Sequence, residues 1–210
     1  MTDMTPTLAT SCAALPPEGV NFSRGGPSRN CPALSFPPEL LLKAQGVSVA
    51  FFDVDGVLTD GGLYFSEAGE SIKRFNTLDG HGLKLLQRAG ITPVIITGRD
   101  SQALRVRLAA IGITQAHFGT EDKRPAAEQS LAQLGLGWHQ AAAMGDDWPD
   151  LAVMTRSAFA CAPINGHAEV KARAHYVTVA AGGAGAAREF CDVLLAASGH
   201  YARFLAQSSP

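Results

Sequence analysis

The sequence contains no long apolar run, no cluster of basic residues and no closely spaced pair of cysteines. A membrane-spanning helix needs about 20 consecutive apolar residues. A nucleic-acid surface needs clustered Lys and Arg, and the formal net charge of -2 also disfavours one. The four cysteines are scattered, so neither a zinc site nor a disulfide framework is indicated. We therefore expect a cytoplasmic protein whose partners are small molecules or proteins, with no nucleic acid and no membrane among them.

Length and composition favour one globular domain behind a disordered leader. The chain has 210 residues, 46% of them hydrophobic, which is enough for a sizeable core. Residues 1–38 are rich in Pro, Gly, Ser and Asn and have no apolar period, a composition typical of disorder. We expect a disordered leader over residues 1–38, one domain over 39–198 and a C-terminal tail over 199–210.

Short apolar runs alternate with helix-like stretches from about residue 47 onward. The runs predict strands over 47–54, 91–98, 115–119, 140–145, 157–162 and 175–180, several apolar on both faces as covered parallel strands are. Helical spacing predicts helices over 78–90, 101–112, 123–135, 148–156 and 167–174. We expect an α/β fold with a doubly wound, mainly parallel sheet. The stretch 57–75, with its SEAGE turn, predicts a β-hairpin inserted after the first strand.

Acidic side chains follow two of the predicted strands. Asp53 and Asp55 end the first strand in FFDVDGVLTDG, and Asp146, Asp147 and Asp150 follow another in MGDDWPD. Ligands bind such sheets at the carboxyl ends of the strands. Close carboxylates repel unless a cation or a shared proton lies between them, and oxygen ligands without His or Cys favour Mg²⁺ over zinc. The two loops therefore predict a magnesium site.

Two further motifs between these loops suit an anion. ITGRD offers the Thr97 hydroxyl and the backbone N–H groups around Gly98 near a predicted helix start, and EDKRP offers Lys123 as a point charge. Taken singly, Thr97, Asp146 or Asp147 fits a helix cap, and Lys123 fits a solvated side chain. Four motifs in one order, each after a predicted strand, favour a functional site.

The order D-x-D-G-V, T-G-R, K and G-D-x-x-x-D resembles the haloacid dehalogenase superfamily of phosphatases over residues 47–179. The resemblance implies that Asp53 attacks phosphorus to form an aspartyl-phosphate, and that Asp55 protonates the leaving alkoxide and then activates water. It also implies that Thr97, Gly98 and Lys123 hold the phosphoryl group.

The same resemblance implies a magnesium centre. Its ligands would be the carboxylates of Asp53 and Asp146 and the main-chain carbonyl of Asp55. Asp147 and Asp150 would hold these ligands in place from behind.

Longer stretches are similar to one capless family of that superfamily, the 3-deoxy-D-manno-octulosonate 8-phosphate phosphatases: FFDVDGVLTDGGLYFSEAGESIKRFNTLDGHGLKLL, IITGRDS, MGDDWPDLAVM and GGAGAAREFCDVLL. The similarity implies Mg²⁺-dependent release of an eight-carbon sugar acid used for lipopolysaccharide. It also implies a homotetramer in which hairpins such as 62–75 pack together and a neighbour's C-terminal tail helps to close the site.

The sequence supports the capless interpretation independently. Only about 21 residues separate Asp60 from the helical GLKLL, too few for a cap domain of the usual size. The apolar Leu63, Tyr64 and Phe65 would then form an exposed patch that a neighbouring subunit covers, or else fold back on their own domain.

Arg99 and His81 are the candidate substrate-binding residues. Arg99 suits the carboxylate or phosphate of a sugar acid, although an exposed arginine at a helix start is the alternative. His81 in DGHG lies beside the hairpin in the sequence, but a lone His also caps, packs or lies in solvent.

Three functional hypotheses stay open on the sequence alone. Spacing does not choose between an eight-carbon and a nine-carbon acid, so a nonulosonic acid 9-phosphate or another sugar phosphate is a second possible substrate. The third hypothesis is a non-catalytic oligomeric binding module. The combination of Asp53, Asp55, Thr97, Lys123 and Asp146 disfavours this last hypothesis, because such a module needs neither a nucleophile nor an acid.

Overall fold

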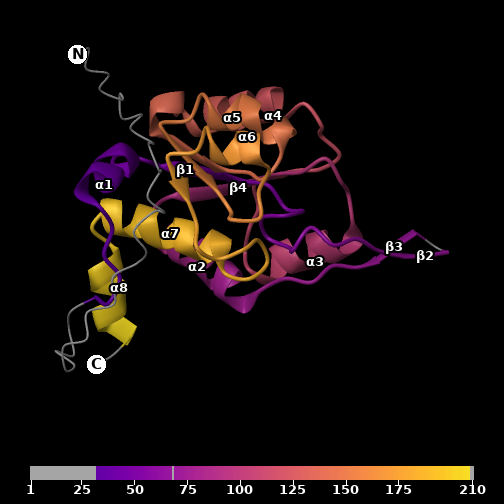
Figure 1. Ribbon diagram of the computed structural model, residues 1–210, viewed down its shortest axis with the longest axis horizontal. Coiled ribbons are helices and arrows are strands. Elements are labelled where there is room, and N and C mark those ends of the chain that lie inside the picture. The colour runs from indigo at the N-terminus through magenta and orange to yellow at the C-terminus, as the bar shows by residue number, and fades with distance from the viewer. Residues whose placement is uncertain (1–31, 68, 209–210) are drawn as a thin grey trace, which may run out of the picture.

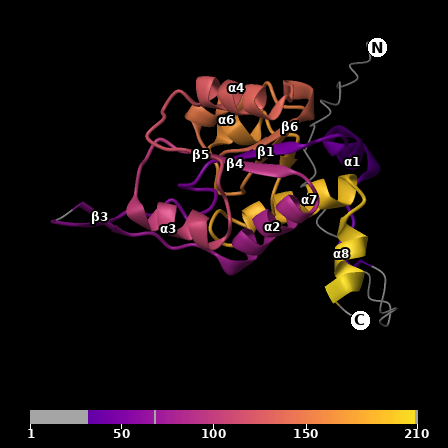
Figure 2. The ribbon, with the colours of Figure 1, turned by 180° about the vertical axis from the view of Figure 1, so that it is seen from behind.

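A six-stranded sheet in which every neighbouring pair is parallel forms the middle layer of the fold (Figures 1 and 2). The computed structural model describes residues 32–67 and 69–208. In spatial order the strands are β5 (Ala116–His117), β4 (Thr92–Ile96), β1 (Val49–Phe52), β6 (Ala141–Met144), β7 (Phe159–Ala162) and β8 (Tyr176–Val177). The central position of β1 places the residues that follow it between two neighbouring strand ends.

Helices cover both faces of this sheet (Figure 1). One face carries α4 (Lys123–Leu134), α5 (Leu151–Met154) and α6 (Ala168–Lys171). The other carries α1 (Pro38–Ala44), α2 (Thr77–Arg88), α3 (Gln102–Ala110) and α7 (Ala186–Ala197), with α8 (Tyr201–Ser208) after it. Two 3₁₀ turns, Trp138–Gln140 and Trp148–Asp150, complete the helical elements. Within the described ranges, no helix is long and apolar enough to cross a membrane.

The two helical layers explain why the strands are apolar on both faces. In β1, Ala50 and Phe52 join the core under α2 and α7, whereas Val49 and Phe51 join the core under α4 and α5. Side chains of a strand alternate between its faces, so a strand covered on both sides needs apolar residues at every position. The predicted doubly wound α/β fold is confirmed.

Some strands are shorter than predicted, and the structure contains two helices near the ends of the described residues that were not predicted. Each of the predicted strands and helices is found, but β5 and β8 contain only two residues each. The tail expected over 199–210 includes α8, whose Phe204 is buried in the core. The leader expected over 1–38 lies outside the described residues except for 32–38, and α1 begins at Pro38.

The predicted hairpin is present after β1 and extends away from the sheet (Figure 1). Its strands are β2 (Tyr64–Ser66) and β3 (Gly69–Ile72), which pair antiparallel. Phe65 is 63% exposed, and Leu63 and Tyr64 are also exposed, so the alternative in which they fold back on their own domain is wrong. Among the described residues between β1 and α2, this hairpin is the only regular element, and no cap domain is present.

A glycine turn before α7 packs against the loop that follows β1. The Asn165 side chain joins them, donating to the Gly56 carbonyl at 3.1 Å and accepting from the Gly182 N–H at 2.7 Å. A Cβ on Gly182 would lie 1.8 Å from the Gly56 carbonyl oxygen. Only glycine permits this approach, so the turn fixes the path of the loop that carries Asp53 and Asp55.

We expect Gly182→Ala to lower the free energy of unfolding by about 3 kcal/mol, because the added methyl group forces two backbone segments apart. Gly135→Ala is the matched control. Gly135 has φ +66°, and a Cβ added there would have no atom within 4 Å, so only backbone strain of about 1 kcal/mol is expected. Urea unfolding of both variants checks this, and equal losses would show that the Gly182 turn is not tightly packed.

Candidate active site

Three loops at the carboxyl edge of the sheet bring the predicted residues together. Asp53 follows β1 directly, Thr97 follows β4, and Asp146 lies two residues after the end of β6. Since β1 pairs with both β4 and β6 in parallel, the three loops emerge side by side at one edge. The sheet topology therefore gathers residues that are far apart in the sequence.

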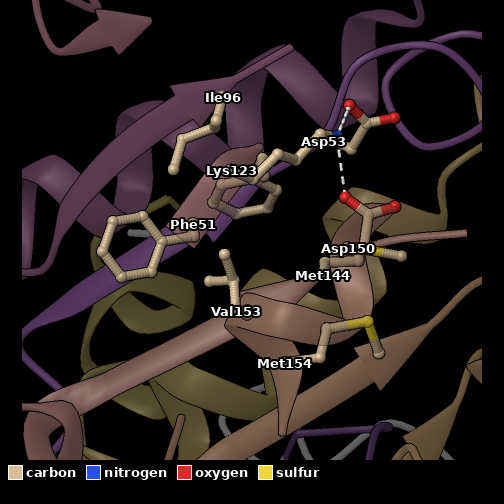
Figure 3. Close-up of a pocket in the computed structure, with 10 residues that line it drawn as sticks. Phe51, Asp53, Ile96, Lys123, Met144, Asp150, Val153 and Met154 are labelled. Carbon is tan, nitrogen blue, oxygen red and sulfur yellow. Dashed lines mark hydrogen bonds and ion pairs between the residues drawn. The ribbon is translucent and has the colours of Figure 1, made fainter. Parts of the chain in front are cut away.

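Lys123, the first residue of α4, lies between two of the aspartates (Figure 3). Its ammonium group contacts Asp53 Oδ1 and donates to Asp150 Oδ1 at 2.7 Å, and its side chain is only 7% exposed. Burial alone would lower the pKa of Lys123, but Asp53 and Asp150 raise it above its usual range. Lys123 is therefore a permanent cation within the site.

One fixed cation does not balance the carboxylates around it. Burial and then Asp150 raise the pKa of Asp53 to about 6, although Lys123 acts in the opposite direction. Burial and then Asp53 and Asp150 raise the pKa of Asp146 to about 8. A further cation would counter the part of both pKa shifts that comes from the neighbouring carboxylates, because opposite charge nearby favours the ionised form of a carboxyl group.

The donor set fits a hard divalent cation. Asp53, Asp146 and Asp150 each offer a carboxylate oxygen, and these atoms all lie within 4.8 Å of one another. The Asp146 carboxylate lies directly over Gly56, where a Cβ would be 2.1 Å from Asp146 Oδ2. Carboxylate oxygens without His or Cys are the ligands that Mg²⁺ prefers. The loop after β1 thus leaves room for Asp146 to face Asp53.

Asp150 differs from the other two because both of its oxygens are already engaged. Oδ1 accepts from Lys123, and Oδ2 accepts from the backbone N–H groups of Asp146 and Asp147 at 3.1 and 3.2 Å. These bonds shape the loop that presents Asp146. The side chains left to hold a cation directly are Asp53 and Asp146.

The other side of the site offers hydrogen-bond donors to an anion. Thr97 is buried, and its Oγ1 accepts from the Arg99 backbone N–H at 3.2 Å, which leaves its hydroxyl proton for another acceptor. Thr97, Gly98, Arg99 and Lys123 all line a groove of about 680 Å³. This arrangement suits a phosphate group held next to Asp53.

The Asp55 side chain points toward cations from two other segments. Lys73, directly after β3, contacts Asp55 Oδ1 and lies 2.7 Å from Glu70 Oε1. Arg99 Nε lies 3.7 Å from Asp55 Oδ2. The base of the hairpin therefore contacts a site residue of its own chain.

All but one of the predicted site residues line the same groove. The lining includes Asp53, Asp55, Thr97, Gly98, Arg99, Lys123, Asp146, Asp147 and Asp150. Asp147 also caps the turn after it, accepting from the Trp148 N–H at 2.8 Å. His81 lies exposed on α2 and is not among the described residues that line the groove, so its substrate contact stays a prediction.

Sequence reasoning missed residues that the structure brings to the site. Glu121 lines the groove, Asn165 joins the glycine turn to the first loop, and Lys73 contacts Asp55. Glu121 stands two positions before Lys123, so the EDKRP motif itself contained a signal for it. Lys73 lies within the family-similar stretch that begins FFDVDG, but nothing in that stretch assigned it a role, and Asn165 lies in none of the quoted stretches. Only the folded chain reveals the contacts of these two residues.

Comparison with curated proteins identifies close relatives. No model of a known protein family matches the sequence. The 3-deoxy-D-manno-octulosonate 8-phosphate phosphatase KdsC of Salmonella typhimurium is 38% identical over 162 residues, which are 77% of this chain and 86% of that protein. The phosphatase of the same name from Yersinia pestis is 38% identical over 159 residues, 76% of this chain and 85% of that protein.

Solved structures agree. A probable YrbI family phosphatase from Pseudomonas syringae superposes with a TM-score of 0.80 and 44% identity, over 82% of this chain and 98% of that one. The 3-deoxy-D-manno-octulosonate 8-phosphate phosphatase of Moraxella catarrhalis was solved with magnesium, phosphate and a KDO molecule. It superposes with a TM-score of 0.78 and 35% identity, over 81% of this chain and 98% of that one. The chain therefore belongs to the 3-deoxy-D-manno-octulosonate 8-phosphate phosphatase family of the haloacid dehalogenase superfamily, as its motifs predicted.

Proposed function

We propose that this protein is a Mg²⁺-dependent phosphoric monoester hydrolase that converts 3-deoxy-D-manno-octulosonate 8-phosphate to the free sugar acid and phosphate. The observation that carries the proposal is the groove itself, in which Asp53, Asp55, Lys123 and Asp146 lie together. The relatives named for this activity share most of the chain, and one was solved with magnesium, phosphate and KDO. In this role the protein supplies a precursor of lipopolysaccharide.

Asp53 is the proposed nucleophile. A carboxylate oxygen of Asp53 forms a bond to phosphorus while the bond from phosphorus to the sugar oxygen breaks, and the leaving oxygen keeps the electron pair and takes a proton from the Asp55 carboxyl group. Asp55, now a carboxylate, removes a proton from the water that attacks the aspartyl-phosphate. This second step releases inorganic phosphate and restores Asp53. Covalent catalysis thereby divides one slow hydrolysis into two easier transfers.

Lys123 and Thr97 are proposed to hold the transferred group. The Lys123 ammonium contacts Asp53 and so lies where charge develops on the equatorial phosphoryl oxygens. The Thr97 hydroxyl and the Gly98 backbone complete the cradle. Fixed donors in a buried site stabilise this charge without having to reorganise.

Mg²⁺ would be held by the carboxylates of Asp53 and Asp146 and by the main-chain carbonyl of Asp55. When bound, it supplies positive charge that offsets the phosphate and the aspartates together. Asp150 is proposed to keep the Asp146 loop in place through its bonds to two backbone N–H groups, and Asp147 supports the same loop.

Arg99 is the proposed partner of the substrate's carboxylate. Its side chain is 45% exposed at the wall of the groove, and the planar guanidinium group matches a carboxylate in a bidentate way. The structure of a single chain gives no support for the predicted contact between His81 and the substrate. The second candidate substrate is a nonulosonic acid 9-phosphate, because the volume of the groove, about 680 Å³, does not by itself select an eight-carbon over a nine-carbon acid.

A cytoplasmic homotetramer is proposed as the working form. Tyr64, Phe65 and Ile72 expose apolar side chains on one hairpin, and such patches are uncommon on monomers unless a partner covers them. The proposed catalytic domain is 39–198, with residues 1–38 as a leader and 199–210 as a tail.

The substrate assignment is tested by phosphate release from a panel of sugar phosphates, with Mg²⁺ and with EDTA. We expect Mg²⁺-dependent release with a strong preference for 3-deoxy-D-manno-octulosonate 8-phosphate. Asp53→Asn has the same shape but cannot form the covalent intermediate, so turnover should fall by at least about 1,000-fold while the circular dichroism spectrum stays unchanged. Preference for a nine-carbon acid would move the substrate to the second candidate, and full activity in Asp53→Asn would remove the mechanism.

Thermal unfolding tests the metal site. Because the pKa of Asp146 is raised from 3.8 to about 8, the folded state holds a proton that the unfolded chain loses. In EDTA, therefore, stability should fall as pH rises from about 4 to about 8, and Asp146→Asn should reduce this fall. Saturating Mg²⁺ at pH about 8 should raise the Tm of the wild type by about 5 °C or more.

Asp146→Asn should lose this rise in Tm, because it removes a ligand. The control is Asp100→Asn, since Asp100 pairs with Arg105 in an exposed position outside the groove. The control variant should keep the full effect of Mg²⁺. An equal rise in Asp146→Asn would contradict the metal assignment.

Analytical ultracentrifugation tests the assembly. We expect the wild type to sediment with about four times the chain mass of 21.9 kDa, and Phe65→Asp to sediment as a smaller species because it places a charge in the apolar patch. Leu42→Asp on α1, where Leu42 is equally open to solvent, serves as the control and should leave the mass unchanged. A wild-type monomer would refute the tetramer.

A further inference from the structure

Lys73 is a buried cation that lies outside the four short motifs D-x-D-G-V, T-G-R, K and G-D-x-x-x-D. Its side chain is only 2% exposed, although it belongs to the base of a hairpin whose other side chains are largely in solvent. It contacts Asp55 Oδ1 and lies 2.7 Å from Glu70 Oε1. A lysine is seldom buried unless it is paired, so this side chain is held in place by the two carboxylates.

The position of Lys73 relative to the groove distinguishes it from a substrate ligand. Asp55, Arg99 and Lys123 line the groove, whereas Lys73 is not among the described residues that line it. Lys73 therefore contacts Asp55 without being part of the described groove lining. It binds one carboxylate oxygen, Oδ1, while Oδ2 lies 3.7 Å from Arg99 Nε, a separation beyond a hydrogen bond.

We propose that Lys73 is a positioning residue for Asp55. By holding Oδ1, it fixes the rotation of the carboxyl group and leaves Oδ2 as the oxygen that gives a proton to the leaving alkoxide and later takes one from the attacking water. The inference rests on the proposed function, because it is the phosphatase reaction that assigns Asp55 this work. Glu70 in turn keeps the ammonium group of Lys73 in place.

This assignment gives the hairpin a role within its own chain. Proton transfer requires the acid to lie within hydrogen-bond reach of the leaving oxygen, and Asp55 follows Asp53 on an irregular loop in which no other element fixes its side chain by a direct hydrogen bond in the described structure. The segment after β3 supplies that restraint. A displaced acid affects only those steps in which a proton moves.

The test is Lys73→Met, which keeps the length of the side chain and removes the charge. We compare kcat/KM for 3-deoxy-D-manno-octulosonate 8-phosphate with kcat/KM for p-nitrophenyl phosphate, since this ratio reports the events up to cleavage of the ester bond. The sugar leaves as a basic alkoxide and needs the proton, whereas p-nitrophenolate leaves without one. We expect a loss of about 30- to 100-fold with the sugar phosphate and less than about threefold with p-nitrophenyl phosphate.

Matched variants separate positioning from folding. Lys73→Arg keeps a cation and should restore most of the activity. Arg74→Met removes the neighbouring charge, which pairs with Asp60 on the surface, and should leave both substrates unaffected. If Lys73→Met does not fold because Asp55 and Glu70 then face each other unpaired, the double variant Lys73→Met/Glu70→Gln removes that repulsion and takes its place in the comparison.

Two outcomes would overturn the inference. An equal loss with both substrates would show that Lys73 supports the phosphoryl site or the fold as a whole, and unchanged kcat/KM for the sugar phosphate would show that Asp55 needs no such restraint. Failure of the proposed function is visible separately, in the wild type. If the wild type prefers another sugar phosphate, the comparison uses that ester, which also leaves as an alkoxide.

Discussion

The rest of this structure depends on one constraint, the repulsion between carboxylates that lie close together at one edge of the sheet. Such a group of carboxylates requires cations nearby. Asp53, Asp146 and Asp150 meet because parallel strands end together. In a site shielded from water, like charges at this separation repel far more than they would in solution. Lys123 offsets part of this repulsion through its ion pairs with Asp53 and Asp150. Burial and then the neighbouring carboxylates raise the pKa values of Asp53 and Asp146, and a divalent cation would offset the second of these causes.

The central sheet was predictable because its strands are covered on both sides. Each position of β1 and β6 must be apolar to fill one of the two cores, so the strands stand out in the sequence as continuous apolar runs. The helices at the ends of the chain lacked such a signal. With seven residues in α1 and eight in α8, two turns of helix give too few apolar positions to establish a period. Packing against α7 contributes to the stability of both helices.

The candidate site also contains some residues that were predictable from the sequence and others that were not. Asp53, Thr97 and Asp146 were predictable because each lies within two residues of the end of a strand, and the topology of a parallel sheet then brings them together. Lys73 was not predictable. Its ammonium group reaches Asp55 across 18 positions of sequence, and the direction of a side chain after a hairpin depends on how that hairpin joins the domain. No local period or motif encodes such a contact.

The hairpin has an exposed apolar tip and a base that contacts the site, and the sequence alone does not show that these two parts differ. Its tip is apolar and exposed, with Phe65 open to solvent, whereas its base places Lys73 against Asp55. A cap domain would close a groove of about 680 Å³ from above, but here the segment after β1 is too short for one. In the tetramer proposed above, a neighbour that covered the tip would contact the same two-stranded element whose base places Lys73 against Asp55. Because the chain between the tip and Lys73 is only a few residues long, a subunit contact at the tip and the position proposed for the Asp55 side chain would then depend on one short segment.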